Sequence, residues 1–307
     1  MNYKVYVDPK KIGKNHFSAL QNAFPHFEFI ADKEDSYQAD IIIDYPAIAT
    51  KKQLEQYPNL KWIQFLTAGY NNVDLDYLRE RNILVSNAKG VYSITIAEDV
   101  ITKILVLNRL VSKYVMNMKQ QVWQSEQKEE EIYQSTVGIL GAGSIATEIA
   151  KRLHPFEVSV LGYRKNEIHA EFFDQIYVGR TGLEQLLKQS DIVIVALPLN
   201  EETKLLFGTK EFSLMKTNAL FINIGRGEIV NQEALIQALQ TKQIRGAALD
   251  VTSPEPLPVN SPLWTMEQVF ITPHNAAYST KMLSRLAAFL KLNLALFDQH
   301  KKIQNKI

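Results

Sequence analysis

The sequence predicts an α/β protein built from two successive parallel sheets, each covered by helices. Short apolar runs alternate with amphipathic segments along all 307 residues, and chains of strand–helix–strand units produce this pattern. A glycine-rich turn between a strand-like and a helix-like segment lies near the start of the second series of such units. The length also suits two domains better than one.

The first series of apolar runs ends near Ala97. Helices are expected at segments such as Lys51–Tyr57 and Leu75–Arg81, because their apolar residues recur at helical spacing. The expected strands are Val5–Val7, Phe27–Ile30, Ile41–Ile43, Trp62–Leu66 and Ile83–Val85.

The second series starts at Val137. Several of its runs are continuously apolar, as parallel strands covered on both faces require. The expected strands are Val137–Leu140, Val158–Tyr163, Ile192–Ala196, Leu220–Ile224, Ala247–Leu249 and Val269–Thr272. The polar span Met118–Ser135 before them favours a solvated loop or helix end, with a subunit-facing arm as the alternative. The amphipathic segment Thr280–Asp298 predicts a C-terminal helix.

The composition limits the classes of function. Lysine and arginine number 34 against 33 acidic residues, a net charge of +1, so no global field attracts nucleic acid or anionic membrane. Without cysteine there are no disulfides, thiolate nucleophiles or cysteine metal ligands, and no metal is expected. The N-terminus MNYKVYVDPK lacks the apolar core of a signal peptide, and charges interrupt the apolar stretch Ile94–Val111. We therefore expect a buried helix at that stretch and a cytoplasmic protein.

The segment TVGILGAGSIATEIAKRL predicts a dinucleotide site. A β-branched strand runs into Gly141 and Gly143, and a helix follows from about Ile145. Glycines let backbone N–H groups approach a pyrophosphate, which then faces the helix N-terminus. Ala146 takes the third small position and still permits close packing of helix on strand. The alternative is an ordinary strand–helix turn, but strand, turn, helix and next strand occur in the required order.

A basic pair follows the next expected strand. An acidic residue at this point usually holds the ribose diol of NAD, whereas this chain has Arg164 and Lys165. Two cations there suit the 2′-phosphate of NADP. The alternative is that both are solvated surface cations.

Arg226 lies between two glycines, directly after the strand Leu220–Ile224. Ligands of doubly wound sheets bind beyond the carboxyl ends of the strands, and a guanidinium can clamp a carboxylate with two hydrogen bonds. The alternative is a plain strand–helix turn whose helix is capped by Asn231.

A histidine and a glutamate follow two further strands. His274 comes just after Val269–Thr272, where an imidazole could protonate a developing alkoxide. Glu255 lies in a proline-rich loop after Ala247–Leu249, and a carboxylate bonded to an imidazole would favour its protonated form. The alternatives are a structural loop histidine and an exposed loop glutamate.

Seven segments occur in order along nearly the whole chain. They are LKWIQFLTAGYNNVD, NAKGVYSITIAEDV, VGILGAGSIA, VALPLNEET, FINIGRGEIV, AALDVTSPEPLP and PLWTMEQVFITPHNAA. In sequence and spacing they resemble the D-isomer-specific 2-hydroxyacid dehydrogenase family. The resemblance implies a flavodoxin-like substrate domain from residues 1–97 and 282–307, a Rossmann cofactor domain from residues 98–281, and a homodimer formed through the cofactor domain.

The resemblance also implies roles for the residues at the strand ends. Arg226 would bind the substrate carboxylate and polarise the carbonyl group. His274 would be the general acid and base, with Glu255 as its partner, and both Arg226 and His274 would contact the substrate. The backbone at Ala68 and Gly69 would hold the carboxylate as well.

Cofactor contacts follow from the same resemblance. Asp250 would face the nicotinamide amide, and the loop around Pro198 would line the cofactor. The implied cofactor-binding residues are Gly141, Gly143, Ser144, Ile145, Arg164, Lys165, Leu197, Pro198, Thr203, Ile224, Gly225, Asp250 and Ala276. Arg164 departs from the acidic residue that is frequent in the family, so NADP is the expected cofactor and NAD the second choice.

Together these inferences predict an enzyme that interconverts a 2-oxo acid and a D-2-hydroxy acid by hydride transfer and runs as a reductase. Its two domains would close over the substrate and exclude water. One rival is a dinucleotide-sensing interaction protein on the same fold, and another is a dehydrogenase of amino acids or formate. The substrate side chain stays open, because Tyr70, Tyr92 and Trp264 could line the pocket or be core aromatics.

Overall fold

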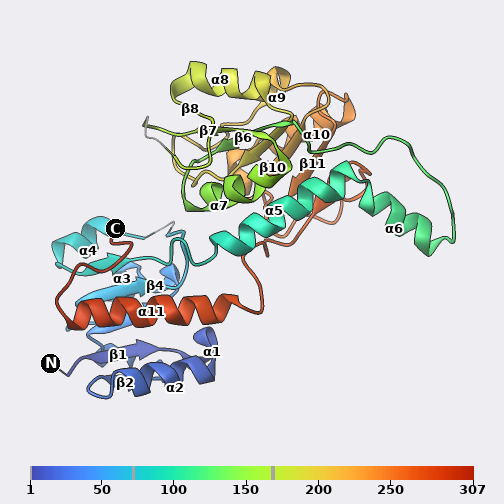
Figure 1. The fold of residues 1–307 in the computed structure, drawn as a ribbon. Helices are drawn as coiled ribbons and strands as arrows, with labels where there is room; N and C mark the ends of the chain where they lie inside the picture. The colour runs from blue at the N-terminus through green and yellow to red at the C-terminus, as the bar shows by residue number, and fades with distance from the viewer. Residues whose placement is uncertain (1, 71–72, 167–169) are drawn as a thin grey trace. The chain divides into compact units, whose positions relative to one another are not determined.

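The computed structural model describes residues 2–70, 73–166 and 170–307, and the chain forms two compact units (Figure 1). Unit 1 comprises residues 1–92 and 278–307, and unit 2 comprises residues 93–277. The boundaries expected from the sequence, 97/98 and 281/282, lie slightly later in the chain. Two of the residues in the segment LKWIQFLTAGYNNVD, at positions 71 and 72, lie outside the described residues.

Unit 1 is built on a parallel sheet with the strand order β2-β1-β3-β4-β5 in its described part. Its first strand lies inside the sheet, between the second and the third, which is the flavodoxin-like order. Val5 of the first strand is aligned with Phe29 on one side and Ile41 on the other. The strands are β1 (Lys4–Val7), β2 (Glu28–Ile30), β3 (Ile41–Asp44), β4 (Trp62–Phe65) and β5 (Leu84–Ser86).

The helices of unit 1 include α11, which returns from the end of the chain and packs Leu286, Leu290 and Leu294 into the core of this sheet (Figure 1). The helices are α1 (Pro9–Ile12), α2 (Lys14–Ala23), η1 (Ser36–Gln38), η2 (Pro46–Ile48), α3 (Lys51–Leu54), α4 (Leu75–Glu80) and α11 (Met282–Asp298). The sequence predicted that α3 extends to Tyr57, which is wrong. Pro58 follows Tyr57, and the residue before a proline disfavours helical dihedral angles.

Unit 2 is built on a second parallel sheet, with the order β12-β11-β10-β9-β6-β7-β8 among the described residues. Starting from β6, this is the Rossmann order with one further strand, and the order reverses between β6 and β9. The strands are β6 (Thr136–Leu140), β7 (Ser159–Tyr163), β8 (Gln175–Tyr177), β9 (Ile192–Val195), β10 (Leu220–Asn223), β11 (Gly246–Leu249) and β12 (Val269–Ile271). The sequence did not predict β8, because this short edge strand has an exposed first residue and no apolar run.

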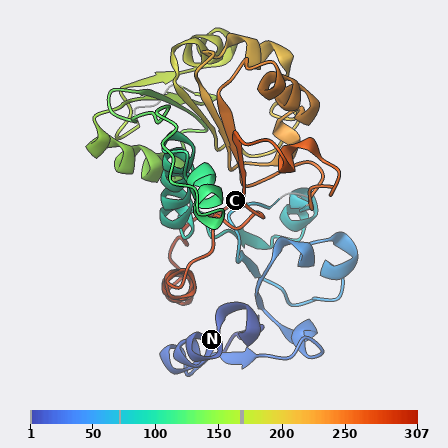
Figure 2. The same cartoon turned by 90° about the vertical axis from the view of Figure 1, so that its right-hand side faces the viewer.

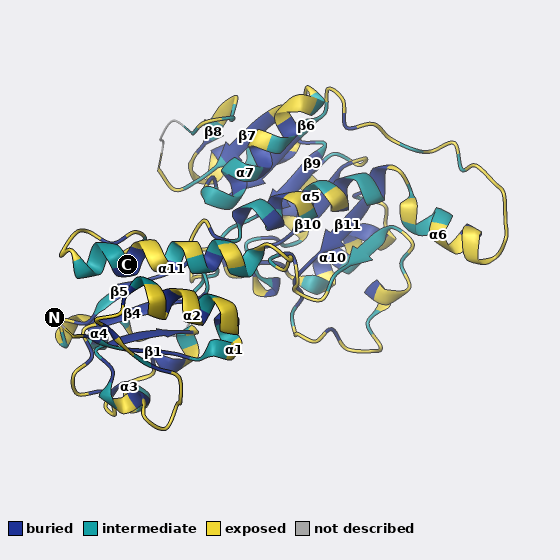
Figure 3. Cartoon of the chain, turned by 60° about the horizontal axis from the view of Figure 1, so that its bottom comes forward, coloured by how far each residue is buried: buried dark blue, intermediate teal, exposed yellow. Residues whose placement is uncertain are grey.

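Helices cover both faces of the second sheet. Figures 1 and 2 show α5 and α7 in green on one face and α8 to α10 in yellow to orange on the other. Each face has its own apolar core, and the buried strands are dark blue in Figure 3. The helices are α5 (Ser93–Asn108), α6 (Val111–Lys119), α7 (Ser144–Leu153), η3 (His154–Phe156), α8 (Gly179–Gln189), α9 (Thr209–Leu214), η4 (Gly227–Ile229), α10 (Gln232–Gln240) and η5 (Pro262–Trp264).

Residues 111–129 extend from unit 2 as an arm (Figure 1), and Ile132 then returns to an apolar core of that unit. Leu110 takes a left-handed conformation, with φ +53°, and separates α5 from α6. An irregular segment then leads from Gln120 to β6, as the polar composition of Met118–Ser135 predicted. Within the described ranges, no helix is long and apolar enough to cross a membrane.

Candidate active site

The turn between β6 and α7 is shaped by two glycines with different roles. Gly141 has φ +99°, and a Cβ there would lie 2.7 Å from the carbonyl oxygen of Ala196, so both the dihedral angle and the packing require glycine. The nearest atom to a Cβ at Gly143 would be the Gly141 carbonyl oxygen, at 3.9 Å. Unlike Gly141, Gly143 is not required by close packing. Its missing side chain instead leaves open space in front of the helix.

This open space faces the N-terminus of α7. The first bond of the helix runs from the Thr147 amide to the Gly143 carbonyl, 2.9 Å, so the amides of Ser144 and Ile145 precede it and belong to the donors that a helix leaves for a ligand. As N-cap, Gly143 has no side chain that could accept them. The turn also lies where the strand order reverses, between β6 and β9. These features fit the pyrophosphate of a nicotinamide dinucleotide.

The loops after β9 and β10 pack closely at the same edge of the sheet. A Cβ at Gly225 would lie 2.8 Å from the Leu197 carbonyl oxygen. The Thr203 hydroxyl donates to the Pro198 carbonyl at 2.7 Å and so closes the loop after β9 on itself. Thr203 therefore shapes the wall of the predicted cofactor site. Two other predicted contacts, Ile224 and Ala276, have buried side chains.

The basic pair after β7 does not act as two equivalent cations. Arg164 is half-buried, and its amide donates to the Tyr177 carbonyl at 3.1 Å. Lys165 is exposed and forms an ion pair with Glu202, with Nζ–O distances of 2.8 and 3.2 Å. Glu202 raises the pKa of Lys165. Of the two, Arg164 is the better candidate for a 2′-phosphate.

The turn that carries Arg226 depends on a polar residue that the sequence did not single out. Asn223, buried at the end of β10, accepts the Gly225 amide at 3.0 Å and donates to the Arg226 carbonyl at 3.0 Å. A Cβ at Gly227 would lie 1.9 Å from the Thr252 carbonyl oxygen, so glycine is needed for the loops after β10 and β11 to meet. An asparagine in an otherwise apolar strand was the signal available in the sequence.

Arg226 itself is half-buried. Its Nη1 donates to the Gly225 carbonyl at 2.7 Å, which uses one of the five donors of a guanidinium. Asn231 caps α10 by accepting the Ala234 amide at 3.0 Å. The turn therefore does lead into a capped helix, as the alternative interpretation of the sequence proposed. This capping does not involve the side chain of Arg226.

The structure brings His274 and Glu255 together. The His274 Nδ1 lies 2.8 Å from Oε2 of Glu255, and the side chains are 48% and 39% exposed. Oε1 of Glu255 accepts the Thr252 amide at 3.2 Å, which orients the carboxylate. Because Nδ1 is bonded to the carboxylate, Nε2 is the ring nitrogen left to exchange a proton with a ligand.

The backbone of His274 is strained and is held by Asp250. His274 has φ +49°, a conformation that is uncommon for residues other than glycine and clusters at functional sites. Its amide lies 2.8 Å from the Asp250 carbonyl and 3.0 Å from the Thr272 carbonyl. The Asp250 carboxylate accepts from the Thr272 hydroxyl at 2.6 Å and from the amides of Asn275 and Ala276 at 3.1 and 3.2 Å. Asp250 thus organises the whole turn around the histidine.

Asp250 has a buried charged neighbour that the sequence did not reveal. Lys103, in α5, is 0% exposed, pairs with Asp99 one turn earlier, and lies 3.9 Å from Oδ1 of Asp250. Burial raises the pKa of Asp99, against the opposing effect of the hydrogen bond from Lys103. In the sequence, this lysine interrupts an apolar helix and looks like a solvent-facing residue.

Unit 1 contains the loop predicted to bind a carboxylate through its backbone. The Thr67 carbonyl accepts the Ala88 amide at 2.9 Å, and the Ala68 carbonyl accepts the Asn87 side chain at 2.7 Å. In a trans peptide the N–H points in the opposite direction to the carbonyl of the same peptide group. The amides of Ala68 and Gly69 therefore point away from Ala88 and Asn87, which bind the carbonyls of these two peptide groups.

The three aromatic residues left open by the sequence have different surroundings. The Tyr92 hydroxyl donates to the Leu66 carbonyl, and burial raises its pKa to about 12, so it braces the loop rather than facing solvent. The Trp264 indole donates to the Pro258 carbonyl at 3.0 Å. Tyr70 is exposed.

A glycine turn that fits a dinucleotide pyrophosphate and a hydrogen-bonded histidine–glutamate pair, on loops at one edge of one sheet, suit a nicotinamide-dependent dehydrogenase. The family model "D-isomer specific 2-hydroxyacid dehydrogenase, NAD binding domain" matches residues 101–276. Glyoxylate/hydroxypyruvate reductase B of Escherichia fergusonii is 36% identical over 235 residues, which cover 74% of this chain and 72% of that protein. The chain belongs to the D-isomer-specific 2-hydroxyacid dehydrogenase family.

Solved structures share the fold, and one of them belongs to the same family. A family member from Aeromonas salmonicida has a TM-score of 0.86 at 30% identity and covers 100% of this chain and 98% of its own. An acyclic imino acid reductase, Bsp5, in complex with NADPH and D-Arg, has a TM-score of 0.85 at 25% identity, with 99% of each chain covered. The protein is an NAD(P)-dependent oxidoreductase that interconverts a 2-oxo acid and a D-2-hydroxy acid.

Proposed function

We propose that this enzyme reduces small 2-oxo acids such as glyoxylate and hydroxypyruvate, with NADPH in preference to NADH. The observation that carries the proposal is the His274–Glu255 pair, 2.8 Å apart, at the sheet edge that also presents the dinucleotide cradle. The Escherichia fergusonii relative is a glyoxylate/hydroxypyruvate reductase, which supports the substrate class.

When bound, a nicotinamide cofactor would supply the hydride that reduces C2 of the substrate. Arg226 binds the substrate carboxylate and polarises the carbonyl group. His274 donates a proton from Nε2 to the carbonyl oxygen, and in the reverse direction it takes the proton back. Glu255 keeps the imidazole oriented through its contact with Nδ1.

Two regions of the chain supply the proposed contacts. We assign residues 98–281 to cofactor binding, with the thirteen residues named from the sequence as contacts, and residues 1–97 and 282–307 to substrate binding. In the substrate region, the amides of Ala68 and Gly69 are the proposed carboxylate donors, because their neighbouring carbonyls are held elsewhere.

The preference for NADPH rests on Arg164. Its guanidinium belongs to a half-buried residue directly after β7, where the adenosine ribose of a Rossmann ligand lies. Lys165, held by Glu202, is a weaker contributor. The Bsp5 structure contains NADPH, which supports use of the phosphorylated cofactor by this fold.

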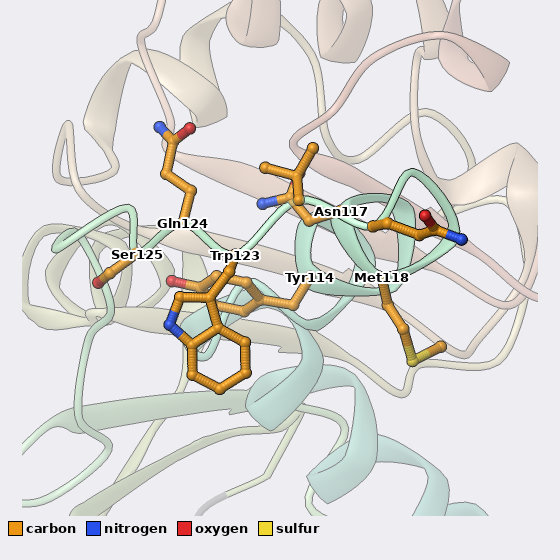
Figure 4. Close-up of a pocket in the computed structure, with 8 residues that line it drawn as sticks. Tyr114, Asn117, Met118, Trp123, Gln124 and Ser125 are labelled. Carbon is orange, nitrogen blue, oxygen red and sulfur yellow. The ribbon is translucent and has the colours of Figure 1, made fainter.

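We also propose a homodimer formed through the arm of unit 2. Trp123 is fully exposed and Met118 is 70% exposed, and a hollow of about 580 Å³ lies between them and Tyr114 (Figure 4). Exposed tryptophan and methionine around a hollow are typical of a surface that a partner covers. A second copy of the chain would cover this surface.

The deciding experiment measures turnover of NADPH with glyoxylate, hydroxypyruvate, phenylpyruvate and a branched 2-oxo acid, in the wild type and in variants of Arg226. Arg226→Ala and Arg226→Lys should each lower kcat/KM about 100-fold or more, because an ammonium cannot replace the two parallel hydrogen bonds of a guanidinium. Arg79→Ala, which removes an exposed arginine of unit 1, is the control. Near-normal turnover by Arg226→Lys contradicts the clamp, and no turnover of any 2-oxo acid by the wild type contradicts the proposed function.

A further inference from the structure

The interior of unit 2 contains an unusual group of charges formed by Asp99, Lys103 and Asp250. The Lys103 side chain is 0% exposed, and those of Asp99 and Asp250 are 20% and 3% exposed. Burying an ammonium is costly unless carboxylates compensate it. A lysine at an apolar position of a core helix therefore calls for a reason beyond packing.

Lys103 connects two elements that are far apart in the sequence. It bonds to Asp99 within α5, and its Nζ lies 3.9 Å from Oδ1 of Asp250, just after β11. The same Oδ1 accepts the Thr272 hydroxyl and the Asn275 amide. The ammonium thus lies behind the carboxylate oxygen that organises the turn after β12.

The turn after β12 has a specific need for such support. His274 has φ +49°, and a conformation of this kind persists only where the surroundings hold it. The hydrogen bonds that hold it converge on Asp250, whose carboxylate accepts on both sides of the histidine. If that carboxylate rotates, the donors on both sides of His274 lose their acceptor together.

We propose that Lys103 is a positioning residue, which fixes the orientation of the Asp250 carboxylate and balances its charge, and thereby holds the turn that carries His274. Asp99 anchors the ammonium from the other side. The kinetic part of this inference rests on the proposed function, in which His274 transfers the proton. The structural part concerns the free protein alone.

The alternative is that the Asp99–Lys103 pair only stabilises α5. Three variants separate the two. Lys103→Met removes the ammonium from both aspartates. Asp99→Asn removes the charge of Asp99 but keeps an oxygen that accepts from the ammonium, which therefore stays beside Asp250. The double variant Asp99→Asn/Lys103→Met removes the pair without leaving Asp99 as an uncompensated charge. As a control, Arg180→Met/Glu211→Gln removes another ion pair with a buried carboxylate in unit 2.

The first readout is amide hydrogen exchange of the segment Thr272–Ala277, measured without cofactor or substrate. We expect exchange about tenfold faster or more in Lys103→Met and in the double variant, and near wild-type exchange in Asp99→Asn and in the control. Wild-type exchange in the double variant would overturn the proposal, and so would equally fast exchange in Asp99→Asn. If Lys103→Met does not fold, the double variant and Asp99→Asn still decide the question.

The second readout is steady-state reduction of glyoxylate with NADPH. Lys103→Met and the double variant should lower kcat about tenfold or more, with a smaller change in KM, because a displaced histidine impairs proton transfer more than substrate binding. The control should lower the melting temperature and leave kcat unchanged. An unchanged kcat in the double variant would overturn the kinetic part. Absence of turnover in the wild type would contradict the proposed function alone, since hydrogen exchange tests the positioning role independently.

Discussion

Tyr92 gives the stability of unit 1 a specific dependence on alkaline pH. Its hydroxyl donates to the Leu66 carbonyl, and its pKa is raised to about 12 by burial first and then by Tyr45 and Tyr278. A tyrosine in the unfolded chain titrates near pH 10. Between pH 10 and 12 the folded state therefore keeps a proton that the unfolded state has lost.

The sign and size follow from proton linkage. A raised pKa in the folded state means that the contribution of Tyr92 is fully present below pH 10 and is lost as pH rises through 12. At pH 11 the loss is about 1.4 kcal/mol, and above pH 12 it approaches about 2.7 kcal/mol, because a tenfold change in a protonation equilibrium corresponds to about 1.36 kcal/mol. Tyr92→Phe removes this dependence and also the bond to Leu66, at a cost of about 1 kcal/mol at neutral pH.

The assay is urea unfolding of the wild type and of Tyr92→Phe at pH 8 and pH 11. The variant should be less stable at pH 8, and its further loss of stability by pH 11 should be smaller than that of the wild type by about 1.4 kcal/mol. Tyr6, whose pKa is also raised to about 12, is present in both proteins and cancels. Tyr37→Phe, at an exposed tyrosine, should follow the wild type. Parallel stability curves for the wild type and Tyr92→Phe would refute the reasoning.

Three further predictions concern activity and assembly. Glu255→Gln should lower kcat about tenfold to 100-fold. Added to His274→Ala, it should have little further effect, because the carboxylate acts through the imidazole. Additive losses in this double-mutant cycle would show that the two residues act independently. Arg164→Asp should lower the ratio of kcat/KM for NADPH to that for NADH about ten- to 100-fold, and a wild type that prefers NADH would make Arg164 a surface cation. Trp123→Ala should shift the mass measured by light scattering from dimer toward monomer, whereas Tyr37→Ala should not. A monomeric wild type would contradict the proposed homodimer.

The fold was largely predictable because the central strands of both sheets are buried on both faces. Continuous apolar runs then mark them in the sequence, as in Ile192–Val195. The exceptions were local: the edge strand Gln175–Tyr177 presents no such run, and Lys51–Leu54 ends early because a proline follows the next turn. Edge strands and helix ends depend on neighbours that a linear pattern does not contain.

The sequence by itself determined which residues stand at the carboxyl ends of the parallel strands, and hence that Arg226, His274 and the turn at Gly141 share one edge of a sheet. Only the tertiary structure decided how these residues are held. It joins Lys103 of a helix to Asp250 of a distant strand end, and it pairs Lys165 with Glu202. The positions of the strands along the chain follow from short-range patterns of burial, whereas such contacts depend on angstrom-scale distances between side chains that are far apart in the chain.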